Sequence, residues 1–176
     1  MKKGVARNER RGGKKGQVEL SFGMIFSIFL IIVFIAFAIY AIGKFLDIQK
    51  SAKTGQLVQN FQADIDKMWK SSSGSQEVEY SLANSVSLAC FQDFELPKKG
   101  PRQDIYDDLR LARSENENFL FYPVGSSGGI LGVEIKNINL RQMTASENPY
   151  CIENENGIIK MIISKGAGEA LVKIKR

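Results

Sequence analysis

A run of 24 residues without a charged side chain, from Leu20 to Gly43, constrains this 176-residue chain more than any other feature. At about 1.5 Å per residue, a helix over this run is roughly 36 Å long, enough to cross a hydrocarbon core of about 30 Å with some tilt. The run is apolar on all sides of such a helix, whereas a helix lying on a protein core is apolar along one stripe. The run therefore predicts a transmembrane helix at about residues 20–43.

The net charge of +5 is concentrated at the N-terminus. Residues 1–16 contain seven basic side chains and one acidic side chain, a net of +6, whereas the remaining 160 residues contain 17 basic and 18 acidic side chains, a net of −1. Because Lys and Arg beside a spanning helix are retained on the cytoplasmic side, residues 1–16 predict a basic cytoplasmic leader and a C-terminal part outside the cell membrane. A basic arm can also bind nucleic acid, but beside a membrane helix we expect lipid as the partner and no nucleic acid.

The apolar run also has to be distinguished from a secretory signal that is removed. Ala36-Phe37-Ala38 has the small-x-small pattern of a signal cleavage site. The apolar region before it is already too long for such a signal, and the run continues through residues 39–42. We therefore expect the helix to stay on the protein as a single-pass anchor.

The helix is expected to continue beyond the membrane, giving one element over residues 17–70. From Asp47 to Lys70 there is no proline, and the pattern becomes amphipathic. The apolar face of this half, expected on a core, covers an arc of about 120° and contains Leu57, Val58, Phe61, Ile65, Met68 and Trp69. In the membrane half, aromatic side chains cluster on one side. This cluster is either simply lipid-soluble or a packing face for neighbouring helices, to which the small pair Gly23 and Ser27 would contribute.

The remaining residues predict an α+β fold, with a mainly antiparallel, β-rich head domain over residues 76–176 after a flexible linker at residues 71–75. Residues 96–102 read as a loop and 137–143 as ambiguous, and glycine-rich turns are expected at 125–129 and, as a hairpin, at 154–157. A short helix is expected at 103–113, and strands are expected at 78–82, 86–91, 119–124, 130–135, 150–152, 158–163 and 170–174.

Two cysteines, Cys90 and Cys151, lie in the part expected outside the cell, where disulfides form. Both belong to apolar, strand-like runs, so pairing these strands would bring the sulfurs together; the alternative is two separate buried thiols. The chain contains no histidine, which excludes His-based zinc sites and Ser-His-Asp or Cys-His catalysis. Ser126 and Ser127 in the glycine-rich turn therefore have no histidine base. We expect no enzymatic activity, no cofactor and no metal site.

The junction before the apolar run reads Lys14-Lys15-Gly16-Gln17-Val18-Glu19-Leu20. It resembles the prepilin signal of type IV pilin-like proteins, in particular the class III signal of archaeal type. The resemblance implies that a prepilin-type membrane peptidase cuts after Gly16, with Lys15 and Gly16 as recognition residues and Gln17 as the new N-terminus. Pilin-like proteins also have a long helix that is membrane-embedded in its first half, amphipathic in its second half and capped by a β-rich head, which is the order expected here.

The resemblance implies a structural or interaction protein of the cell surface, such as a filament subunit, whose transmembrane helix contacts further copies or other pilin-like subunits. One position departs from the pattern: many pilins carry glutamate five residues after the cut, where this chain has Ser21, and the nearest acid is Glu19. The alternative function is therefore a permanently anchored binding or accessory domain outside the membrane that does not polymerise.

Overall fold

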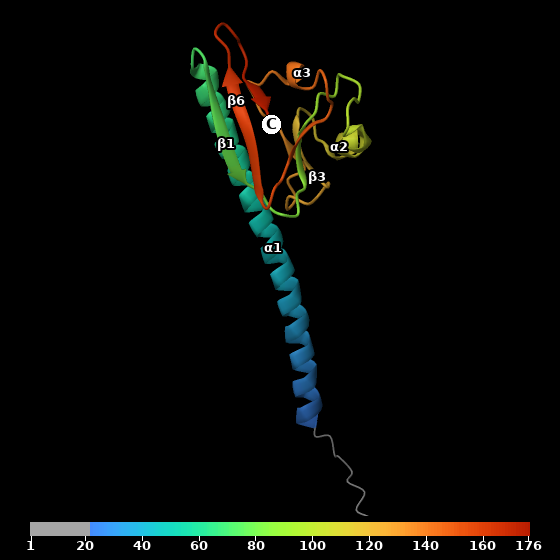
Figure 1. Cartoon of the computed structure of the whole chain (residues 1–176). Helices are drawn as coiled ribbons and strands as arrows, with labels where there is room; N and C mark the ends of the chain where they lie inside the picture. The colour runs from blue at the N-terminus through green and yellow to red at the C-terminus, as the bar shows by residue number, and fades with distance from the viewer. Residues whose placement is uncertain (1–21) are drawn as a thin grey trace, which may run out of the picture. The chain divides into compact units, whose positions relative to one another are not determined.

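The computed structural model describes residues 22–176 and begins with one long helix, α1, at Phe22–Lys70 (Figure 1). The chain divides into two compact units, of which the second comprises Ile42–Arg176. We call this second unit the helix–head unit. It contains the C-terminal part of α1 together with everything that was predicted as a separate head domain. The division between the two compact units thus falls within α1, at residues 41 and 42, and not at the expected linker.

The helix–head unit contains two antiparallel sheets and confirms the predicted α+β class. The first sheet has the order β1-β6-β7, and the second has the order β4-β3-β2-β5. The strands are β1 (Gly74–Ser81), β2 (Leu88–Phe91), β3 (Phe119–Tyr122), β4 (Gly132–Val133), β5 (Tyr150–Glu153), β6 (Ile158–Lys165) and β7 (Lys173–Lys175). The short helical elements are η1 (Gln103–Ile105), α2 (Tyr106–Ala112) and α3 (Leu140–Met143). The ambiguous segment 137–143 thus ends in a helix.

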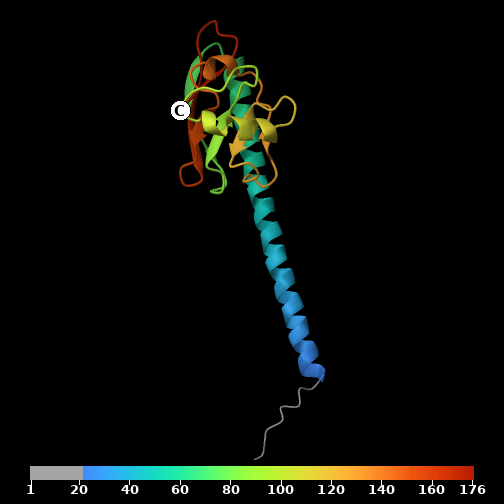
Figure 2. The ribbon, with the colours of Figure 1, turned by 90° about the vertical axis from the view of Figure 1, so that its right-hand side faces the viewer.

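The amphipathic stripe of α1 forms one wall of the main core, as the sequence predicts. Leu57, Phe61 and Ile65 are at most 2% exposed. They belong to one buried cluster with side chains of both sheets, among them Tyr80, Phe91, Phe119, Met161 and Ile163. Figure 1 shows β1 and β6 running beside this part of α1, and Figure 2 shows the yellow and orange segments in front of it.

Trp69 does not lie in the core, contrary to the expectation from its place on the stripe. Its side chain remains 40% exposed, and its indole Nε1 donates a hydrogen bond to the carbonyl of Ala170 at 3.0 Å. The buried stripe ends at Met68 because the chain reverses immediately after α1. A polar ring nitrogen at this last turn can bond a loop carbonyl and keep contact with water.

The linker expected at residues 71–75 is a tight reversal of residues 71–73, after which β1 begins at Gly74. The hydroxyl of Ser71 donates to the carbonyl of Met68 at 2.6 Å, and Lys165 donates to the carbonyl of Ser71 at 2.9 Å. The bond from Ser71, together with a second bond from Lys165 to the carbonyl of Trp69, caps the end of α1, whose last carbonyls have no partner inside the helix. The reversal therefore directs β1 back along α1.

The turn predicted at residues 154–157 is present, closed by backbone hydrogen bonds in both directions between Glu155 and Ile158, but the flanking strands do not continue as a hairpin ladder. Asn156 and Gly157 have φ angles of +54° and +86°, as a tight turn of the primed type requires. β5 pairs with β2, however, and β6 pairs with β1 and β7. The turn thus leads the chain from one sheet to the other, a topology that the local residues do not encode.

The glycine-rich turn at residues 125–129 connects β3 to β4, as predicted, and in addition touches α1. Gly128 has a φ of +77°, and a β-carbon there would lie 2.5 Å from the amide nitrogen of Ser51 and 2.6 Å from the carbonyl oxygen of Asp47. Beside this contact, the buried hydroxyl of Thr54 donates to the carbonyl of Ser127 at 3.3 Å. The turn is therefore held to α1 at a point where only glycine fits.

We predict that Gly128→Ala destabilises the helix–head unit more than Gly125→Ala. Both glycines have positive φ, but a β-carbon at Gly125 meets nothing within 4 Å. The left-handed backbone costs about 1–2 kcal/mol in either variant. Steric overlap with the backbone of α1 adds about 1–3 kcal/mol at Gly128 alone. Urea unfolding of the full chain in detergent, followed by circular dichroism, measures the difference, and equal losses would contradict the contact.

Candidate functional site

The first candidate surface is the apolar part of α1. Every residue from 22 to 49 is exposed, and this range includes the apolar side chains of the predicted span. Among the described residues α1 is the one helix long and apolar enough to cross a membrane, and its most apolar window is not buried at all. A buried core helix is thereby excluded, whereas a signal sequence would satisfy the same criterion of length and composition. The exposed apolar area far exceeds what a soluble monomer normally presents.

One polar group within this surface, the hydroxyl of Ser27, is satisfied inside the helix. The hydroxyl of Ser27 donates to the carbonyl of Gly23 at 2.8 Å, one turn earlier. Such a bond hides the hydroxyl from an apolar environment.

The aromatic cluster is exposed throughout and comprises Phe22, Phe26, Phe29, Phe34, Phe37, Tyr40 and Phe45. Its role as a packing face for other helices stays a prediction. The expected processing residues Lys15, Gly16 and Gln17 lie outside the described residues.

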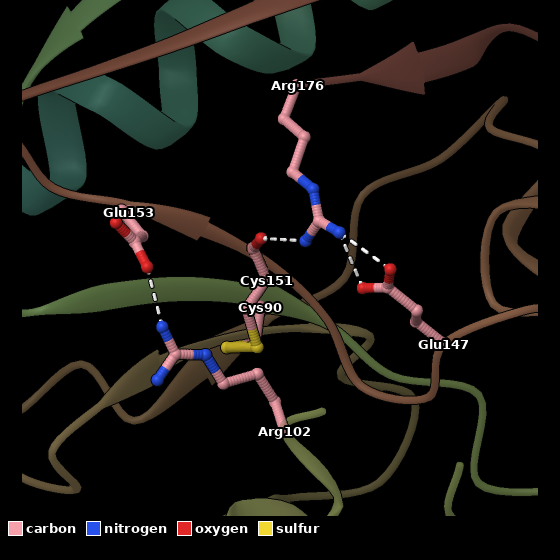
Figure 3. Close-up of polar contacts among 6 residues, drawn as sticks. All are labelled: Cys90, Arg102, Glu147, Cys151, Glu153 and Arg176. Carbon is pink, nitrogen blue, oxygen red and sulfur yellow. Dashed lines mark hydrogen bonds and ion pairs between the residues drawn. A yellow bond between two sulfur atoms is a disulfide. The ribbon is translucent and has the colours of Figure 1, made fainter. Parts of the chain in front are cut away.

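The second candidate is the region around the disulfide, drawn in Figure 3. Cys90 and Cys151 are directly opposite in the antiparallel pair β2–β5, and the structure joins their sulfurs. Their Cα atoms are 4.0 Å apart, close to the spacing of about 4.5 Å in a non-hydrogen-bonded antiparallel pair. Both side chains are at most 3% exposed. The predicted bridge is thus present, for the predicted reason that its two strands pair.

A charged frame surrounds the outer edge of β5. Arg176 donates to the carbonyl of Cys151 at 3.0 Å and to both oxygens of Glu147 at 2.7 Å, while Arg102 pairs with Glu153 at 2.5 Å (Figure 3). Cys151, Arg102, Glu153 and Arg176 are among the residues lining an open hollow of about 690 Å³. Both arginines already have carboxylate partners. These ion pairs stabilise the edge of the sheet, and they leave no arginine in the hollow unpaired for an added anion.

Lys160 and Glu155 complete the charged lining of this hollow. A hydrogen bond from Lys160 to Glu79 on the neighbouring strand β1 raises the pKa of the lysine above its ordinary value. The pair is a cross-strand ion pair in solvent, where such pairs contribute little to stability.

The side chains considered for catalysis serve local structure. The hydroxyl of Ser126 donates to the carbonyl of Pro123 at 2.6 Å, and that of Ser127 donates to the carbonyl of Ile130. Both bonds lie within the β3–β4 turn. On α2, Asp107 pairs with Lys98 at 2.7 Å. Within residues 22–176, no group of three or more His, Cys, Asp or Glu side chains is placed to hold a metal ion.

Two polar contacts between α1 and the rest of the unit were not predicted from the sequence. The hydroxyl of Tyr80 donates to Asp64 on α1 at 2.7 Å. Burial, the hydrogen bond and the charge of Asp64 together raise the pKa of Tyr80 far above its ordinary value. The side chain of Asn137 likewise donates to Asp66 at 2.9 Å. Asp64 and Asp66 look like ordinary solvent-facing helix residues in the sequence, and no local signal distinguishes them.

Comparison with models of protein families, with curated proteins and with solved structures finds no match to this chain. The functional argument therefore rests on the chain's own residues and geometry. The resemblance of the residue 14–20 junction to a prepilin signal remains a sequence-based expectation.

We predict that reducing the disulfide lowers the stability of the helix–head unit. The bridge closes a loop with a sequence separation of 61 residues. In the chain-entropy model such a loop corresponds to roughly 4 kcal/mol. That is a large share of the about 5–15 kcal/mol typical of a folded domain. Urea unfolding of the full chain in detergent, with and without reductant, measures the loss.

The matched control is the double variant Cys90→Ala/Cys151→Ala, whose stability should not respond to reductant. Titration of the denatured, unreduced protein from its native compartment should find no free thiol. Two free thiols there would contradict the bridge.

Proposed function

We propose that this chain is a single-pass, membrane-anchored structural or interaction protein of the pilin-like type, with its head outside the cell. The observation that carries the proposal is the division of one helix between two kinds of surroundings. Residues 22–49 of α1 are exposed and almost entirely apolar, whereas Leu57, Phe61 and Ile65 are buried in a β-rich head. A helix with an uncovered apolar part needs lipid or other helices around it.

The head supports a structural role more than a catalytic one. Its buried residues are overwhelmingly apolar, its cysteines are joined, and its candidate nucleophiles are bonded within a turn. A disulfide of this kind fits a compartment outside the cytoplasm. In this proposal the partners are membrane lipid, a prepilin-type peptidase, and further copies or other pilin-like subunits that contact the apolar part of α1.

The second candidate is a permanently anchored binding or accessory domain that is never cut and does not polymerise. The observation that favours it is Ser21, which stands where many pilins carry a glutamate five residues after the cut. Both candidates share the anchor and the orientation. They differ in whether residues 1–16 are removed.

Processing separates these two candidates. We expect the mature chain to begin at Gln17. Gly16→Val should block the cut, because it replaces the glycine that the peptidase is expected to recognise with a larger residue. Gly13→Val is the matched control, since it makes the same change in the leader away from the junction and should leave processing intact. The measurement is N-terminal sequencing and intact mass of protein from its native membrane. An intact Met1 with the peptidase present would favour the permanent anchor.

Orientation is tested separately. The net charge of +6 before the span predicts residues 71–176 outside. Protease added to right-side-out vesicles should therefore digest the head, while inverted vesicles should protect it until they are opened with detergent. A disulfide-bonded head can resist proteases even when it is accessible. Both vesicle preparations are therefore digested under the same conditions. Protection in right-side-out vesicles with digestion in inverted ones would show the opposite orientation.

A further inference from the structure

The turn between β3 and β4 carries features that a simple connection does not need. Residues 118–133, between Glu117 and Glu134, form the second-longest stretch of this chain without a charged side chain. Within it, Pro123 and Val124 are exposed, Val124 to 43%, and Leu131 is exposed to 36%. We call residues 122–131 the uncharged loop. The loop thus combines exposed apolar side chains with the absence of charge.

The uncharged loop is fixed at one level of α1. Gly128 abuts the backbone at Asp47 and Ser51 so closely that a β-carbon would not fit, and the Gly128 carbonyl accepts a hydrogen bond from Ser51. Ser127 is tied to Thr54 in the same way. All of these residues belong to the helix–head unit. The loop therefore cannot shift along α1 without losing these contacts.

The exposed apolar surface of α1 ends at the same level. Within the helix–head unit, Phe45 is 60% exposed and Ile48 is 64% exposed, although charged residues already begin at Lys44. The last exposed apolar side chains of this surface thus lie beside Asp47, where Gly128 meets the helix, so a bilayer whose outer edge lies at these side chains would reach the loop.

A second apolar element adjoins the loop. Leu111 at the end of α2 is 87% exposed, and it lines one open hollow of about 430 Å³ with Tyr122, Pro123 and Val124. Tyr122 is half-buried, and aromatic side chains with a polar tip are enriched at membrane interfaces. The carboxylate of Asp108 also lines this hollow. The chemistry thus suits neutral or zwitterionic headgroups better than an anionic surface.

On the proposed function as a membrane-anchored protein, we propose that the uncharged loop lies in the headgroup region of the bilayer, with Val124 in contact with lipid. The head then has a second attachment to the membrane besides its helix. Contact costs little because the loop itself carries no charged side chain, and its exposed apolar side chains gain from leaving water. A membrane-attached head would be held in one orientation toward neighbouring subunits.

Depth-dependent quenching of tryptophan fluorescence tests this inference, because the chain has a single tryptophan, Trp69. In a Trp69→Phe background, Val124→Trp places the probe in the uncharged loop of the full chain. The protein is reconstituted in phosphatidylcholine vesicles whose acyl chains carry bromine at shallow or deep positions. We expect a blue-shifted emission and a loss of fluorescence that is larger with shallow than with deep bromine.

Leu171→Trp in the same background is the matched control. Leu171 is 38% exposed, similar to Val124, but its neighbour Ala170 contacts Trp69, 22 residues beyond Asp47 on α1. That separation corresponds to roughly 33 Å along the helix, so bromine should not quench this probe. Phe34→Trp in the predicted span is the positive control and should be quenched most by deep bromine.

The outcomes separate the inference from the function on which it depends. Quenching at residue 34 with no more quenching at 124 than at 171 would overturn the loop contact and leave the anchor intact. No quenching at residue 34 would overturn the membrane anchor and the loop contact together. A blue-shifted probe at 124 that bromine does not quench would indicate a protein partner and overturn lipid contact.

A variant that fails to unfold cooperatively in urea is not used. Leu111→Trp then serves in place of Val124→Trp, because its side chain is almost fully exposed and lines the same hollow. The same shallow quenching is expected there, and its absence overturns the inference.

Discussion

The helix–head unit depends on the burial of one face of α1, and Phe61 is at the centre of that face. Its ring is completely buried and lies 5.5–6.0 Å, centroid to centroid, from the rings of Tyr80, Phe91 and Phe119. These partners come from both sheets, so a single side chain of α1 links the two. Removing a buried phenylalanine side chain typically costs about 3–5 kcal/mol. Such a loss is comparable with the whole stability of many domains.

The core of the head therefore includes residues of α1. The first sheet has three strands and the second has four, and the main buried cluster joins them through Leu57, Phe61 and Ile65. Without α1, those inner faces would expose their apolar residues to water. The polar contacts of Asp64 with Tyr80 and of Thr54 with Ser127 then fix the position of the helix along the sheets.

Much of the fold was predictable from the sequence because its signals are local. The spacing of Leu57, Phe61 and Ile65 predicts the buried face, and the apolar, strand-like runs at residues 78–82 and 158–163 predict β1 and β6. The disulfide was predictable because Cys90 and Cys151 lie in strand-like runs that pair. The division of the strands into two sheets was not, since the turn at residues 154–157 looks the same whether or not its flanking strands pair with each other. The contact of Gly128 with α1 also lacks a signal, because glycines in turns are common and its neighbour is 77 residues away along the chain. The candidate surface on α1 was predictable from composition alone, and the loop beside it required the tertiary contacts.

Two soluble fragments test whether the second half of α1 is part of the head's core. One contains residues 42–176 and the other contains residues 71–176, and both keep the disulfide. The measurement is the dispersion of amide resonances in NMR spectra, together with the cooperativity of urea unfolding. We expect dispersed resonances and a cooperative transition for residues 42–176, and neither for residues 71–176. A dispersed spectrum and an equally stable, cooperative transition for residues 71–176 would contradict this expectation.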